Sequence, residues 1–278
     1  MLRRLIAVSV PALVLLAPPP AEAFQLFGIK FFESSKDQSE SDDIIGTPQP
    51  YEVELVVAGE DKELEERFGS ASSLWRGKDK PASGAAGLIA AARGDYRRLL
   101  DASYAAGRYG PSISITINGK EAASLLPDEE FGGSARVRIN IDPGPSFVFS
   151  KATVENRAPV PTNRLDRVDD ANREAFQPGQ PAFSGIILGT ARVAVEEWRH
   201  QGYPKATISQ QEIVANHDTN TVDATLVVDP GRYATFGPVT VNGTERMDAD
   251  FVAWMTGIKP GEEYDPDEIQ AARDRLAR

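Results

Sequence analysis

A six-residue pattern ending in Asp-Pro-Gly occurs twice in this chain of 278 residues, at 139–144 and at 226–231. The two copies lie 87 residues apart (229 − 142). That period is longer than the units of solenoid repeats, which run to roughly 50 residues, and it suits a small α/β module used in series. The repeat therefore predicts a chain built from tandem copies of one module.

The residues around each copy keep the same order. A helical pattern ending in Gly and Tyr precedes each Asp-Pro-Gly, and a strand pattern led by Phe follows it. The leading residues, Phe149 and Phe236, are again 87 residues apart (236 − 149). A third match joins 177–180 to 259–262, at a distance of 82 residues (260 − 178). The chain is thus expected to hold two whole units and the front of a third.

Hydrophobic periodicity predicts the order strand, helix, helix, strand, strand in each whole unit. In the first unit the elements are expected at 51–57, 60–68, 85–106, 113–117 and 136–142. In the second they are expected at 147–155, 162–176, 183–201, 206–214 and 222–229. In the third, a strand at 233–242 and a helix at 248–255 precede a helix that Asp265 caps and Pro266 begins.

The helix at 85–106 has an apolar side at helical spacing, formed by Leu88, Ala92, Leu99 and Ser103. Asp95 and Arg98 fall elsewhere on this helix. A polar loop rich in Gly and Ser precedes it. Because Asp95 and Arg98 fall outside the apolar side, we expect both to face away from the core.

This order of elements predicts an α+β fold of tandem modules. A hairpin joins the last two strands of each module, and the first strand must pair with one of them from the far end of the module. The result is a three-stranded mixed sheet with two helices on one face. The expected boundaries are 50–144 for the first module, 145–231 for the second and 232–278 for an incomplete third.

Such a sheet has open edges, and an edge strand offers unpaired N–H and C=O groups to an incoming extended chain. We expect the second strand of each module to be the edge that pairs with other chains. The candidate residues are Ile113, Ile115, Ile117, Thr207, Ile208 and Ile213.

Residues 1–23 have the pattern of a secretory signal peptide. Arg3 and Arg4 precede an apolar run at 5–17, and an Ala-Glu-Ala at 21–23 matches a small-x-small cleavage site. The apolar run is shorter than the roughly 20 residues that a membrane-spanning helix needs, so a membrane anchor is the less favoured alternative.

The exported chain is expected to begin at Phe24 with a flexible linker at 24–49. The start of this linker, 24–32, is unusually apolar, and 33–43 is rich in Ser, Asp and Glu. The apolar start is expected either to pack on the first module or stay mobile, or to bind a partner.

Composition excludes several classes of function. The chain has no cysteine, which removes disulfides, thiolate metal sites, cysteine nucleophiles and a lipid anchor on an N-terminal cysteine. Its formal net charge is −11, with 41 acidic and 30 basic side chains, so the chain as a whole is a poor candidate for binding nucleic acid or anionic headgroups.

Candidate catalytic and metal-binding residues are few. His200 sits at a helix end, where the helix dipole favours a cation, and His217 falls in the predicted hairpin turn. The acidic clusters at 128–130 and 169–170 fall in polar contexts and are expected to be solvated. No phosphate loop, dinucleotide fingerprint or nucleophile elbow is present, so we expect neither an enzyme nor a bound cofactor. An enzyme remains the last alternative, a hydrolase in which Asp169 and Asp170 converge in a cleft.

Three features together resemble POTRA repeats, the modules that precede the barrel in outer-membrane assembly and secretion proteins. They are Gly202-Tyr203 after a long helix, the strand at 222–231 ending in Asp-Pro-Gly, and the strand pattern at 233–243 followed by 257–264. The resemblance covers about residues 50–278. Within that family the arrangement looks most like TamA, the outer-membrane subunit of the translocation and assembly module.

The resemblance implies a periplasmic arm, at the outer membrane, that assists the insertion or secretion of outer-membrane proteins and autotransporters without nucleotide or metal. Its implied partners are a TamB-like protein anchored in the inner membrane and unfolded substrate chains. Binding is then expected to come from β-augmentation at sheet edges.

The resemblance also implies a C-terminal membrane barrel, and the chain stops at Arg278 inside the third unit. We expect either a fragment of a longer protein or a truncated gene product. The alternatives left open are a general barrel-assembly subunit and a free-standing periplasmic interaction protein.

Overall fold

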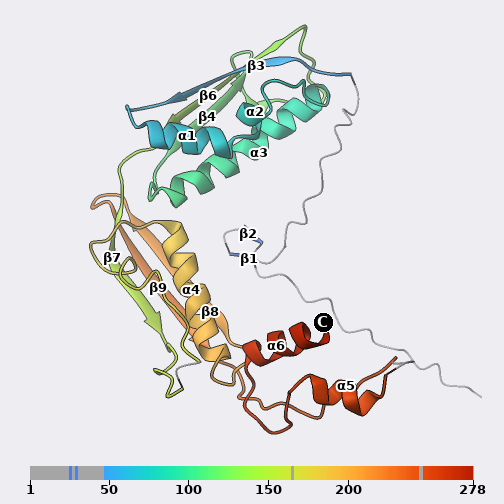
Figure 1. The fold of residues 1–278 in the computed structure, drawn as a ribbon. Helices are drawn as coiled ribbons and strands as arrows, with labels where there is room; N and C mark the ends of the chain where they lie inside the picture. Colours follow the sequence, from blue (N-terminus) through green and yellow to red (C-terminus); the bar gives the residue numbers. More distant parts are fainter. Residues whose placement is uncertain (1–24, 27–28, 31–46, 164–165, 244–246, 278) are drawn as a thin grey trace, which may run out of the picture. The chain divides into compact units, whose positions relative to one another are not determined.

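A computed structural model describes residues 25–26, 29–30, 47–163, 166–243 and 247–277 of the chain (Figure 1). By internal contacts the chain divides into two units, residues 1–43 and residues 44–278. In the first unit, the short strands β1 (Gln25–Leu26) and β2 (Ile29–Lys30) pair antiparallel. The predicted signal peptide and most of the predicted linker lie outside the described residues.

The first sheet of the larger unit is mixed and has the order β3-β6-β4-β5. Its strands are β3 (Tyr51–Val57), β4 (Ser112–Ile117), β5 (Lys120–Glu121) and β6 (Ala135–Asp142). β3 pairs parallel with β6, and β4 pairs antiparallel with β6. The prediction that the first strand pairs with one of the last two strands of the module is confirmed, and the partner is the last strand, β6. The extra strand β5 arises because Asn118 and Gly119, both with positive φ, turn the chain back along β4.

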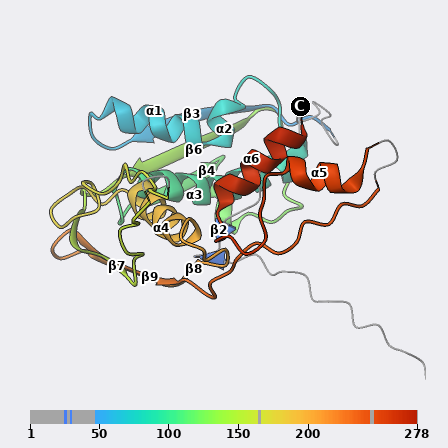
Figure 2. The ribbon, with the colours of Figure 1, turned by 60° about the horizontal axis from the view of Figure 1, so that its bottom comes forward.

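Three helices cover one face of this sheet: α1 (Lys62–Ala71), α2 (Ser73–Arg76) and α3 (Gly84–Ala105) (Figures 1 and 2). A short 3-10 turn, Ala122–Ser124, follows β5. α1 begins where the Asp61 carboxylate accepts the N–H groups of Glu63 and Leu64. The core between helices and sheet is made of aliphatic side chains and Phe68, all almost free of solvent contact.

The second sheet has three strands in the order β7-β9-β8. They are β7 (Val148–Glu155), β8 (Thr207–Asn216) and β9 (Thr221–Asp229), with α4 (Ser184–Arg199) against them. β7 pairs parallel with β9, and β8 pairs antiparallel with β9. This sheet repeats the topology of the first, so the α+β fold with mixed sheets predicted from the sequence is confirmed.

The predicted helix at 162–176 is wrong for the part of it that the structure describes, which forms turns. Two features explain the difference. The Asp170 side chain, only 2% exposed, pairs with Arg157 at 2.6 Å, and its carboxylate accepts the N–H of Asn172 at 3.1 Å, a local bond that competes with helix formation. A Cβ added to Gly189 of α4 would stand only 2.3 Å from Asn172 Nδ2. The segment that carries Asn172 is therefore packed tightly onto α4.

The predicted third module, 232–278, contains α5 (Ala249–Met255) and α6 (Pro266–Leu276). The predicted cap is present: the Asp265 carboxylate accepts the N–H of Asp267. Asp248, whose cap was not predicted, accepts the N–H of Phe251. The predicted strand at 233–242 is wrong in the described residues, where only an isolated bridge joins Thr235 to Glu263. In the first two modules the first strand pairs along its length with the last strand, whereas no strand of the described residues lies beside 233–242.

The sequence repeat reappears as a repeated set of backbone hydrogen bonds. The N–H of Phe147 donates to Gly107 O at 2.9 Å, and 87 residues on (234 − 147) the N–H of Ala234 donates to Gly202 O at 2.8 Å. The carbonyls of Phe147 and Ala234 then accept from Ala182 at 2.9 Å and Tyr264 at 3.1 Å, a pair 82 residues apart (264 − 182). We call the two bonds of Phe147, to Gly107 and Ala182, the first joint, and the two bonds of Ala234, to Gly202 and Tyr264, the second joint. The same backbone connection thus follows α3 and α4.

None of the helices in the described part of the chain combines the length and the apolar character needed to cross a membrane.

Candidate functional site: the open edge of β3

Outer strands are where this fold offers unused hydrogen-bonding groups. In the first sheet the outer positions belong to β3 on one side and to β4 with the short β5 on the other. In the second sheet they belong to β7 and β8. The sequence predicted β4 and β8 as the pairing edges.

Side chains occupy much of the β4 edge. The N–H of Ile115 donates to Tyr96 Oη and to Glu121 Oε1, both at 3.2 Å, and its carbonyl accepts from the Tyr96 hydroxyl at 3.1 Å. The side chains of Ile115 and Ile117 are buried, and that of Ile113 is half-buried. An incoming strand would have to displace Tyr96 and Glu121 to reach Ile115.

The pKa values of Tyr96 and Glu121 favour the hydrogen bonds by which these side chains cover the β4 edge. Burial, followed by the hydrogen bond to Glu121, raises the pKa of Tyr96 to about 12. Burial also raises the pKa of Glu121, but the hydrogen bonds from Tyr96, Ser114 and Ile115 outweigh it and leave the pKa below its usual value. At neutral pH Tyr96 is therefore a neutral donor beside an ionised carboxylate.

The β8 candidates lie on a true outer strand. Thr207 is exposed, while Ile208 and Ile213 are half-buried against the core of the second sheet. A bulge between Ile208 and Gln210 interrupts the pairing with β9. The two predicted sets of residues belong to different sheets.

The β3 edge was not predicted, and its backbone groups can be assigned from the ladder. The N–H of Ala58 donates to Ile141 O at 2.8 Å, and Pro50 O accepts from Ala135 at 2.9 Å. Because successive residues of a strand direct their backbone groups to opposite sides, the even-numbered residues of β3 face β6. The N–H and C=O groups of Val53 and Leu55 therefore face the open edge.

The start of this edge is already closed. Gln49 belongs to the outward-facing set, and it exchanges two backbone bonds with Ala82, at 3.0 and 2.9 Å. Beyond it, no other strand of the described residues lies beside β3. The free edge thus runs from Tyr51 to Val57.

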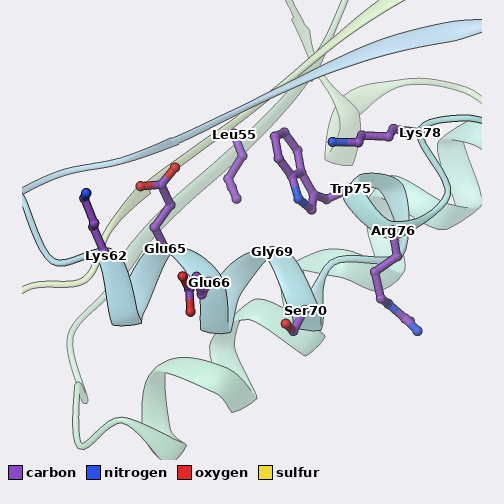
Figure 3. A pocket seen from close by; sticks show the side chains of 9 residues that line it. All are labelled: Leu55, Lys62, Glu65, Glu66, Gly69, Ser70, Trp75, Arg76 and Lys78. Carbon is purple, nitrogen blue, oxygen red and sulfur yellow. The ribbon is translucent and has the colours of Figure 1, made fainter.

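A hollow of about 700 Å³ lies beside this edge, between β3, α1 and α2. Leu55 of β3 and Trp75 of α2 point into the same space, as Figure 3 shows. Gly69 of α1 forms the wall behind the indole, where a Cβ would stand 3.1 Å from Trp75 Cδ1 and Nε1. We call this hollow with the β3 edge the β3 groove; its lining residues are Leu55, Lys62, Glu65, Glu66, Gly69, Ser70, Trp75, Arg76 and Lys78.

Charges of both signs surround the apolar part of the β3 groove. Lys62, Arg76 and Lys78 contribute cations, and Glu65 and Glu66 contribute carboxylates. The Lys78 ammonium lies 4.2 Å from the centre of the Trp75 ring, a cation–π contact. The arrangement suits an extended chain with an apolar side chain in the hollow and polar side chains at its rim.

Asp95 holds α2, and with it Trp75, in place. Its carboxylate is fully buried, which corrects the prediction that it faces away from the core. It accepts the N–H groups of Ser73 and Leu74 at 2.9 and 3.1 Å and the hydroxyls of Ser72 and Ser73 at 2.6 and 2.8 Å. Arg98 neutralises it at 2.9 Å. Adjacent serines before Leu74 and Trp75 are a helix-start signal that could have revealed α2.

The other residues singled out from the sequence do not form a catalytic constellation among the described residues. Asp169 is exposed, whereas Asp170 is committed to Arg157, so these carboxylates do not converge in a cleft. Glu129 pairs with Lys120. His217 packs edge-on against Phe147, with ring centroids 5.4 Å apart.

Comparison with known proteins supports the fold. No protein-family model and no curated protein matches the chain. The crystal structure of POTRA domains 3–5 of BamA from Haemophilus influenzae matches at 15% identity with a TM-score of 0.50, over 85% of this chain and 87% of that chain.

Two further solved structures match at lower TM-scores. POTRA1-3 of the periplasmic domain of Omp85 from Anabaena matches at 17% identity, over 83% of this chain and 84% of that chain, with a TM-score of 0.34. The N-terminal domain of Omp85 from Thermosynechococcus elongatus matches at 16% identity, over 83% and 86%, with a TM-score of 0.32. At 15% identity the BamA likeness establishes fold alone: the chain has the α+β fold of POTRA domains.

Proposed function

We propose that this chain is the periplasmic arm of an outer-membrane protein assembly factor of the Omp85 type, and that it binds extended chains by adding them to its sheets. Its modules span 50–144, 145–231 and 232–278. The POTRA fold and the signal-peptide pattern at 1–23 support this assignment.

The observation that carries the proposal is the free edge of β3 beside the β3 groove. An extended chain at this edge would bond to the outward N–H and C=O groups of Val53 and Leu55. One of its apolar side chains would then enter the space between Leu55 and Trp75. Main-chain bonds supply affinity for any sequence, and the groove selects an apolar side chain at one position.

The energetics favour weak and reversible binding. Each new backbone bond is worth only about 0.5–1.5 kcal/mol net, and one buried apolar side chain adds about 1.5–3 kcal/mol. Loss of translational and rotational freedom offsets about 4 kcal/mol or more of this gain. Such a balance suits an arm that receives many unfolded chains and releases them without nucleotide.

The outer strand β8, with Thr207, Ile208 and Ile213, is proposed as a second pairing edge. Pairing along Ile113, Ile115 and Ile117 of β4 is proposed only for partners that displace Tyr96 and Glu121. Within the class, the sequence resemblance favours a TamA-like protein with a TamB-like partner and autotransporter substrates.

The proposal is tested with a fluorescent peptide of alternating apolar and polar residues and the full chain. Val53→Pro removes an outward-facing N–H and leaves the bonds of β3 to β6 in place, so the variant should fold but bind at least tenfold more weakly. Trp75→Ala, which opens the wall of the β3 groove, should also weaken binding. Trp254→Ala is the matched control, because Trp254 lies 75% exposed on α5, outside the groove.

The assembly role is tested separately in cells that make this protein. Val53→Pro should lower the amount of folded barrel proteins in the outer membrane, and Trp254→Ala should not. Equal peptide binding by wild type and Val53→Pro would contradict the binding site. Lost binding with unchanged barrel levels would contradict the assembly role.

A further inference from the structure

The second joint carries a cluster of metal-ligating side chains, formed by His200, Asp265 and Asp267. His200 Nδ1 lies 3.5 Å from Asp265 Oδ1 and 3.8 Å from Asp267 Oδ2. One ligand atom from each of the three side chains lies within 4.8 Å of the others. The cluster joins the C-terminal end of α4 to the N-terminal end of α6.

The imidazole is unpartnered on the side that faces the carboxylates. His200 Nδ1 is closed off from solvent and makes no hydrogen bond, and the side chain as a whole is 16% exposed. A buried ring nitrogen without a partner is costly unless a proton or a cation supplies one. The nitrogen and the two carboxylates thus point to a positively charged occupant.

The backbone around the cluster is fixed by the second joint. Gly202 O, two residues after His200, accepts from Ala234, whose own carbonyl accepts from Tyr264, the residue before Asp265. The side chains therefore project from elements that are already tied together. Sites built on such elements hold their ligand geometry more precisely than sites on loops.

The first joint shows that the fold does not demand these side chains. Counting back 95 residues from His200, the offset between the joint glycines (202 − 107), gives Ala105. Counting back 82 residues from Asp265 and Asp267 gives Phe183 and Gly185. The same backbone bonds form there with no ligand at any of the three positions. The His and two Asp are thus an addition to the repeat.

We propose that His200, Asp265 and Asp267 bind a divalent transition-metal ion of the zinc class, which ties α4 to α6 at the second joint. One imidazole nitrogen with two carboxylate oxygens suits Zn²⁺, whereas Ca²⁺ and Mg²⁺ prefer oxygen ligands alone. Ligands about 2.0–2.1 Å from a tetrahedral ion are separated by roughly 3.3 Å, close to the two nitrogen–oxygen distances. Water would complete the coordination.

The other interactions of these three side chains do not prevent them from binding a cation. Asp265 Oδ1 also accepts the N–H of Asp267 at 2.9 Å, but a carboxylate offers about four lone-pair positions. The positive end of the α6 dipole opposes a cation, and the negative end of the α4 dipole favours it. Two carboxylates balance the double charge of the ion.

The test is zinc binding by the full chain at pH 7.5, measured by calorimetry with Zn²⁺ alone as the probe. We expect one site per chain and an affinity at least tenfold lower in D267N and in D265S. D265S keeps a good N-cap for α6 while it removes the carboxylate. E268Q, which changes the neighbouring exposed carboxylate, is the matched control and should bind zinc as tightly as the wild type.

The two histidines provide an internal readout by NMR. Zn²⁺ should shift the ring signals of His200 and leave those of His217 unchanged. Asp267 is 73% exposed, so D267N tests the proposal without risk to the fold. Unchanged zinc affinity in D267N, an equal loss in E268Q, or an unshifted His200 signal would overturn the proposal.

Discussion

Asp95 lies in the middle of α3, and its enclosed carboxylate organises the first residues of α2. Because two backbone N–H groups and two hydroxyls depend on it, its loss would leave several buried polar groups unpaired. We expect Asp95→Ala to lower the free energy of unfolding by about 3 kcal/mol or more. Urea denaturation of the full chain measures this change.

Asp101→Ala is the control for that prediction. Asp101 lies on the same helix in a half-exposed pair with Arg97, at 3.8 Å, and such pairs contribute at most about 1 kcal/mol. Similar losses for the two variants would show that Asp95 does not hold α2.

Tyr109 predicts a change with alkaline pH. Its hydroxyl is buried without a hydrogen-bond partner, and burial, followed by the charge of Tyr104, raises its pKa to about 12. The folded chain therefore holds this proton more tightly than the unfolded chain, whose tyrosine has a pKa of about 10. The resulting stability is complete below pH 10 and is lost as the pH rises through about 12.

Tyr109→Phe should remove this loss. At pH 7 the variant should equal the wild type or exceed it by up to about 1 kcal/mol, because an unpaired hydroxyl disappears. Between pH 10 and about 12 its advantage should grow, as measured by thermal unfolding at a series of pH values. A constant difference between the two proteins across that window would contradict the assignment.

Each joint between elements includes a glycine with positive φ, Gly107 in the first and Gly202 in the second. Gly202 has φ +83°, and a Cβ there would stand 2.4 Å from Tyr233 Cε2. Gly202→Ala should therefore cost more than the roughly 1–2 kcal/mol of a left-handed residue, because Tyr233 must move. Gly179→Ala is the matched control, with φ +85° and nothing within 4 Å of the added Cβ.

The comparison of these two variants isolates the close approach at the second joint. The midpoint of urea unfolding should fall further for Gly202→Ala than for Gly179→Ala, and fluorescence of Trp198, which contacts Tyr203, should report the difference. Equal midpoints would mean that the joint tolerates the extra atom.

The elements that the sequence predicted share a physical property. Each strand and helix with a clear apolar period, such as 51–57 and 183–201, is found within a few residues of its expected bounds. The errors fall where a distant contact decides the outcome. Asp170 binds Arg157, and the described part of 162–176 forms turns. No strand of the described residues lies beside 233–242, which makes only an isolated bridge.

The candidate site was only partly predictable for the same reason. An open sheet edge followed from the order of strands, but which edge is open depends on long-range contacts. Tyr96 and Glu121 cover β4, and Asp95 positions Trp75 beside β3. No periodic pattern in the sequence predicts these contacts.

Across the described part of the molecule, one backbone motif recurs after α3 and α4, and the free edge of β3 lies beside a hollow. Repetition of the joints explains the 87-residue period, because each joint ties the end of a helix to the start of the next strand. The free edge of β3 is where we propose that unfolded partners bind.

Residue-resolved amide hydrogen exchange along β3, with and without the alternating peptide, tests this account most directly. In the free chain the amides of Glu52, Glu54 and Val56 should be protected by β6, and those of Val53 and Leu55 should exchange faster. Saturating peptide should protect Val53 and Leu55. Protection that appears only along β8, or nowhere, would contradict the claim that β3 is the binding edge.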